Sequence, residues 1–83
     1  MLKVVLTYYS DRTVEVTSQA LNIEGHVFLL SDLGDVWHSE SRGRAREIWA
    51  IWRGKELMLL RVTDKIRFGQ IYRAIQRTLE QNP

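Results

Sequence analysis

The stretch that decides the fold runs from residue 56 to residue 79 and reads ELMLLRVTDKIRFGQIYRAIQRTL. Its apolar residues change their spacing near Asp64. Before that residue they alternate or run continuously, as in a β-strand, and after it they recur every three or four residues, as on one face of an α-helix. Asp64 suits the N-cap position, because its carboxylate can accept hydrogen bonds from the first amides of a helix. The sequence therefore predicts one amphipathic helix over residues 64–81.

Seven short segments rich in β-branched and aromatic residues precede this helix, and turn residues separate them. The predicted strands cover residues 2–9, 14–17, 20–24, 27–30, 35–40, 47–53 and 56–63, with a turn or a single helical turn at 31–34. We expect an α+β protein made of one domain over residues 1–83: a small, strongly bent antiparallel sheet or partly open barrel of the pleckstrin-homology-like (PH-like) kind, with one C-terminal helix. A mixed sheet with one helix on its face is the competing architecture.

The composition limits the classes of protein to which the chain can belong. There is no cysteine, so disulfides and zinc–thiolate sites are excluded, and this composition suits a reducing cytoplasm. No apolar run approaches the roughly 20 residues of a membrane-spanning helix. The first residues lack the pattern of a signal peptide. The sequence therefore predicts a cytoplasmic location.

The charged residues are distributed unevenly along the chain. Acidic residues outnumber basic ones by six to two in residues 1–41, and basic residues outnumber acidic ones by ten to four in residues 42–83. If the sheet brings the two halves together, the charges mix on the surface. Otherwise the molecule has two electrically distinct faces, which would favour binding to an acidic partner or to a second copy of the chain.

Several short motifs resemble a family of small actinobacterial proteins of unknown function. They are YYSD at 8–11, VEVTS at 14–18, FLLSDL at 28–33, VWH at 36–38 and RFGQIYRAIQR at 67–77. Many members of that family carry an apolar, membrane-like insert between the two blocks of similarity. This chain differs there, because residues 47–62 read as strands and are too short to span a bilayer. The resemblance, which covers nearly the whole chain, implies a PH-like fold and no reaction.

The chain lacks a recognisable catalytic constellation. Its two histidines, His26 in a predicted turn and His38 in a predicted strand, have no metal-ligand spacing and no adjacent nucleophile on the same strand face. The glycines are scattered singly, so there is no phosphate-binding loop. The sequence therefore predicts a non-enzymatic protein with no metal, no cofactor and no small-molecule substrate.

Three arginines within five residues, Arg42, Arg44 and Arg46, form a predicted basic loop. Arginine forks bind phosphate groups well, so the loop could contact nucleic acid or an acidic membrane surface. The alternative is an ordinary solvated hairpin loop. This loop supports a second hypothesis, in which the protein is a peripheral anion-binding module.

The last two predicted strands are apolar on both faces. Trp49 and Ile51 are expected to point one way from the first of them, and Leu57 and Leu59 are expected to share that face on the second. A single-layer sheet normally turns one face to water, so a sheet with two apolar faces must be buried on both sides. The helix could pack on one of these faces, and the barrel interior could enclose the other. The other explanation is a second chain, and the sequence favours a self-associating interaction module, most simply a two-fold dimer, that could also bind a protein partner.

Overall fold

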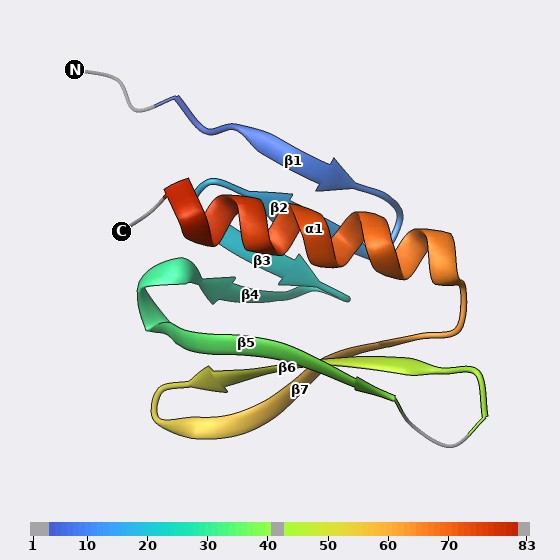
Figure 1. Ribbon diagram of the computed structural model, residues 1–83. Helices are drawn as coiled ribbons and strands as arrows, with labels where there is room; N and C mark the ends of the chain where they lie inside the picture. The colour runs from blue at the N-terminus through green and yellow to red at the C-terminus, as the bar shows by residue number, and fades with distance from the viewer. Residues whose placement is uncertain (1–3, 41–42, 82–83) are drawn as a thin grey trace.

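The computed structural model describes residues 4–40 and 43–81 (Figure 1). Its elements, in chain order, are β1 (Thr7–Ser10), β2 (Val14–Thr17), β3 (Ala20–Ile23), β4 (His26–Leu29), the 3-10 helix η1 (Leu30–Asp32), β5 (Leu33–Glu40), β6 (Arg46–Trp52), β7 (Lys55–Val62) and α1 (Lys65–Gln81). The predicted succession of seven strands and a C-terminal helix is confirmed. The first strand is shorter than expected, because its partner β2 has only four residues. Just before β1, Leu6 still forms hydrogen bonds with Ser18, which follows β2.

The strands form two antiparallel sheets rather than one. The first has the order β1-β2-β3-β4 and the second the order β5-β6-β7, with η1 connecting them (Figure 1). Among the strands of residues 4–40 and 43–81, the two sheets do not hydrogen-bond into a closed barrel. The predicted α+β class is confirmed, and the arrangement of four strands, three strands and one terminal helix is consistent with a PH-like fold.

The core lies between the inner faces of the two sheets and the buried side of α1. The helix packs mainly on β1 and β2 and also touches β6 and β7 (Figure 1). Its buried positions recur at helical spacing, and among them Ile71 is fully buried. The predicted N-cap is confirmed: the Oδ1 atom of Asp64 accepts hydrogen bonds from the amides of Ile66, at 2.9 Å, and Arg67, at 3.1 Å.

A β-bulge changes which side chains of β7 face the core. Ile48 pairs with Leu60, but the next residue of β6, Trp49, pairs with Met58, so Leu59 has no residue opposite it. Leu57 consequently pairs with the buried Ala50 and packs against the core, and Leu59 is only 8% exposed. The expectation that Leu57 and Leu59 share the face of Trp49 is therefore wrong, because strict alternation fails where one strand carries an extra residue.

A polar cluster joins the β1–β2 turn to the first turn of α1. The Asp11 carboxylate accepts a 2.8 Å hydrogen bond from Nε of Arg67, together with bonds from the Tyr9 hydroxyl and the amides of Thr13 and Val14. The hydrogen bond from Arg67, with those from Tyr9 and the two amides, holds the pKa of Asp11 well below its usual range. The cluster therefore links two parts of the chain that are more than fifty residues apart.

We expect Asp11→Asn to lower the free energy of unfolding by about 1 kcal/mol at pH 7, because a half-exposed, charge-assisted pair is screened by solvent. Because the pKa of Asp11 is lowered in the folded state, its contribution is complete above about pH 4–5 and declines as the pH falls toward the folded pKa. Urea unfolding at pH 7 and at pH 2.5 should show a larger difference between variant and native protein at pH 7. Asp35→Asn, at an exposed carboxylate of β5, is the matched control, and an equal loss in both variants would contradict this role for Asp11.

Candidate protein-interaction surface

The outer face of the β5–β7 sheet, which points away from the core, carries an apolar cluster. Its members are Trp37, Trp49, Ile51 and Met58, and we call this cluster the tryptophan face. Trp37 and Trp49 are direct cross-strand neighbours whose rings stack at 14° with their centroids 6.5 Å apart. Trp49 pairs on its other side with Met58, which is 41% exposed. The three side chains therefore form a continuous row across all three strands.

The polar atom of Trp49 on this face has a partner within the same chain. Its Nε1 atom donates to Oε1 of Glu47 at 3.1 Å, and the same oxygen accepts a bond from the Ser39 hydroxyl at 3.3 Å. A tryptophan whose indole N–H is already hydrogen-bonded can be covered by another molecule without leaving an unpaired donor. The arrangement is therefore suited to burial in an interface.

The structure brings together two of the four predicted interface residues and separates the other two. Trp49 and Ile51 are on the tryptophan face and are half-buried, whereas Leu57 and Leu59 belong to the core side. Sequence reasoning missed Trp37 and Met58 as members of this face. Trp37 could have been found from strand alternation once the register of β5 against β6 was known, but the position of Met58 depends on the bulge.

The predicted basic loop is only partly available to an anion. Arg42 lies outside the described residues, and Arg44 is exposed. Arg46 is half-buried: its guanidinium is 3.7 Å from a carboxylate oxygen of Glu40 and 5.5 Å from the ring centre of Phe68. Arg46 therefore already has a carboxylate and an aromatic ring as neighbours.

A pocket of about 450 Å³ adjoins this loop. Its lining combines Arg44 and Arg46 with Lys65, the first residue of α1, and with the acid Glu40. Sequence reasoning missed Lys65, because it lies nearly twenty residues after the loop in the chain. It comes close to the loop only because β7 ends there and α1 begins. An anion here would meet two cations that have no ion pair among the described residues, but it would also meet a carboxylate.

Both histidines are exposed, but their contacts differ. His38 pairs with the buried Ile48 and meets the rings of Phe68 and Tyr72 edge to face, with centroid distances of 5.5 Å and 4.8 Å. His26 lies at the start of β4, next to the ring of Phe28. Among residues 4–40 and 43–81, no group of three or more histidine, cysteine or acidic side chains is placed to hold a metal ion, and no helix is both long and apolar enough to cross a membrane.

Comparison with known proteins identifies no match to this chain among family models, curated proteins or solved structures. The resemblance to the actinobacterial family therefore stays a prediction.

Proposed function

We propose that this chain is a non-catalytic protein-interaction module that self-associates through the tryptophan face, most simply as a two-fold dimer. The observation that supports this most strongly is the stacked pair of Trp37 and Trp49, with Met58 beside it, on a sheet face that points away from the core. Tryptophan and methionine are enriched in interfaces, and tryptophan often carries a large share of the binding energy.

The charges around the tryptophan face support a second copy as the occupant. Glu47 and Arg61 are cross-strand neighbours on β6 and β7, so the face carries both an acid and a base next to its apolar centre. A strongly basic partner would be repelled by Arg61, and a strongly acidic partner would be repelled by Glu47. A two-fold related copy presents the same face in reverse and can set acid against base on both sides.

The size of the sheet face determines the affinity that we expect for the dimer. Three strands of seven or eight residues measure about 14 Å by 23 Å. Two such faces, stacked as in a β-sandwich, would bury on the order of 1,000 Å², which is the lower end for a specific interface. We therefore expect a dissociation constant on the order of micromolar rather than nanomolar.

The module catalyses no reaction and binds no cofactor, and it works in the cytoplasm, which its cysteine-free composition suits. The second candidate, anion binding by the basic loop, draws support from the pocket that Arg44, Arg46 and Lys65 line. Its weakness is the ion pair between Arg46 and Glu40.

A salt titration separates the two candidate functions. Apolar self-association should persist at 0.5 M salt, whereas phosphate contacts lose orders of magnitude in affinity. We expect light scattering after size exclusion to give a mass well above 9.8 kDa at high micromolar concentration, with little change between 0.05 M and 0.5 M salt. A mass of one chain at both salt concentrations would contradict self-association. Tight, salt-sensitive binding of an oligonucleotide or of anionic vesicles by that monomer would favour the basic loop.

A further inference from the structure

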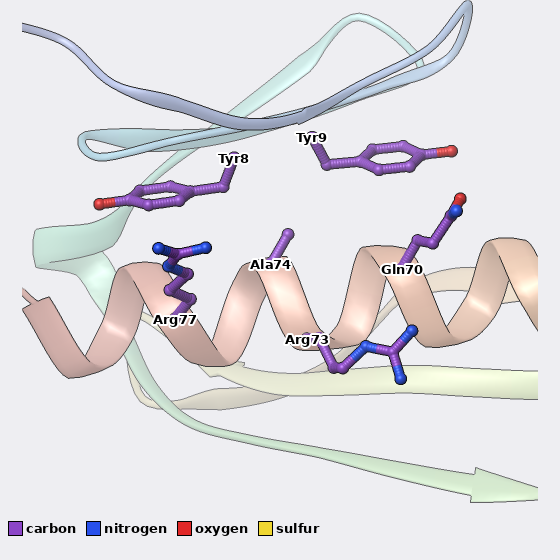
Figure 2. Close-up of a pocket in the computed structure, with 6 residues that line it drawn as sticks. All are labelled: Tyr8, Tyr9, Gln70, Arg73, Ala74 and Arg77. Carbon is purple, nitrogen blue, oxygen red and sulfur yellow. The ribbon is translucent and has the colours of Figure 1, made fainter.

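A groove of about 610 Å³ lies between β1 and α1 (Figure 2), and none of its described lining residues belongs to the tryptophan face. The register of β1 against β2 shifts between Thr7 and Tyr9, so Tyr8 is an extra residue in the pairing. This bulge lets both Tyr8 and Tyr9 point toward the helix. Their rings turn in opposite directions above the small side chain of Ala74, which leaves the space between them open (Figure 2).

The hydroxyl groups of these tyrosines are already used at the two ends of the groove. Tyr8 donates to Oε1 of Gln81 at 2.7 Å, and Tyr9 donates to the Asp11 carboxylate. What the tyrosines offer to a ligand is therefore aromatic surface. The polar atoms that remain to bind it come from the helix.

Two arginines of α1, Arg73 and Arg77, line the groove and carry its charge. The Arg77 guanidinium is 5.5 Å from the ring centre of Tyr8, and the Arg73 guanidinium lies along the helix near Gly69. Arg67, on the same helix, forms an ion pair with Asp11. By contrast, neither Arg73 nor Arg77 forms an ion pair with an acid in the described part of the chain, and the described lining of the groove includes no carboxylate.

Like charges one helical turn apart repel each other. Arg73 and Arg77 are in that relation, and a bound anion would relieve the repulsion. The rise of the helix puts their Cα atoms about 6 Å apart along its axis. That spacing is close to the roughly 6.6 Å between alternate residues of an extended chain, whose side chains point to the same side.

The strand that borders the groove has a free edge. β1 is the first strand in the order β1-β2-β3-β4, so no described strand pairs with its outer side. Unpaired N–H and C=O groups along such an edge can bind an extended peptide as an additional strand. Because β1 and α1 run alongside each other (Figure 1), a strand added there would also follow the helix.

We propose that the groove between β1 and α1 binds an extended acidic peptide of a partner protein. The peptide backbone pairs with the free edge of β1, and acidic side chains at alternate positions bind Arg73 and Arg77. The recognised sequence is of the type acidic–any–acidic. This site goes beyond self-association, because its residues are not part of the tryptophan face and it needs one copy of the chain only.

The test is a titration with a synthetic peptide of alternating valine and glutamate, followed by NMR of the labelled protein. We expect shifts and slower amide exchange in Thr7–Ser10, and shifts of the side-chain Nε signals of Arg73 and Arg77. Each of Arg73→Gln and Arg77→Gln should weaken binding about fivefold, and the double variant about twentyfold. Arg44→Gln, which removes the same charge from the basic loop, is the matched control and should change the affinity less than twofold.

Two modified peptides test the mode of binding. Lysine in place of glutamate should abolish binding, and N-methylation of alternate peptide amides should weaken it at least tenfold, because it removes the donors that would pair with β1. Equal binding of the N-methylated peptide, or of free glutamate, would overturn strand addition. Loss of binding in Arg44→Gln but not in the Arg73/Arg77 double variant would overturn the site. Tighter, equally arginine-dependent binding of single-stranded DNA would overturn the assignment to an acidic peptide.

Discussion

Trp49→Asp should convert the self-associated protein into a monomer at concentrations where the native chain is a dimer. The substitution removes the ring that stacks on Trp37 and pairs with Met58. It also sets a second carboxylate close to that of Glu47, which loses its bond from the indole. Losing a central tryptophan typically costs 2 kcal/mol or more in binding, so we expect the dissociation constant to rise roughly thirtyfold.

The controls for Trp49→Asp separate loss of association from loss of folding. Val27→Asp makes a comparable change at a side chain that is 56% exposed on the other sheet, and it should leave the dimer intact. Met58→Asp acts on the exposed edge of the tryptophan face, so it should weaken the dimer with less risk to the fold. Circular dichroism checks that each variant is folded, and sedimentation velocity gives its mass. Folded Trp49→Asp and Met58→Asp variants that associate as tightly as Val27→Asp would contradict the proposed interface.

Ile71→Ala should bring the protein close to global unfolding. Ile71 has no exposed surface and sits at the centre of the helix stripe that closes the core. Truncating a fully buried isoleucine to alanine costs about 2–5 kcal/mol. The protein loses the free energy of burying the removed carbon atoms, and the neighbouring side chains fill the resulting cavity only partly. A domain of this length has a total stability of roughly 4–12 kcal/mol. We expect a fall in melting temperature of more than about 10 °C.

Ile66→Ala is the matched control for this core substitution, because it makes the same chemical change in the same helix at a residue that is 74% exposed. Its free energy of unfolding should change by less than about 0.5 kcal/mol. Urea and thermal unfolding of the two variants, compared with the native chain, give the difference directly. Similar losses in both variants would mean that α1 does not close the core through the side that carries Ile71.

The order of the elements could be predicted from the sequence because it depends on local patterns. Ile71 and Ile75 follow helical spacing, Asp64 supplies a cap, and the glycine at position 54 marks the turn between β6 and β7, where its φ is +81°. The division into two sheets could not be predicted in the same way. It depends on which strands pair, and that is decided by contacts between residues far apart in the chain.

The candidate site was predicted only in part, and the reason is the bulge at Leu59. Alternation assigns the residues of β7 to two faces, but one extra residue exchanges the faces on either side of it. Trp49 and Ile51 are on β6, which carries no extra residue at either of its register shifts, and they were predicted on the correct face, whereas Leu57 and Met58 exchanged places. Nothing in the local composition of β7 marks the bulge.

The groove between β1 and α1 was not predicted at all. Its aromatic wall and its arginines are more than sixty residues apart in the chain, and the second bulge, at Tyr8, is needed to turn both tyrosines toward the helix. Helical spacing could have shown that Arg73 and Arg77 share one side of α1. The free edge of β1 beside them follows only from the sheet order.

The most direct measurement of the central claim is an isotope-filtered NOE experiment on a mixture of labelled and unlabelled chains at high concentration. It detects only contacts between two copies. We expect cross-peaks between the methyl group of Met58 in one copy and the indole protons of Trp37 and Trp49 in the other. Intermolecular cross-peaks confined to the opposite sheet, at Val27 and Leu29, or none at millimolar concentration, would contradict self-association through the tryptophan face.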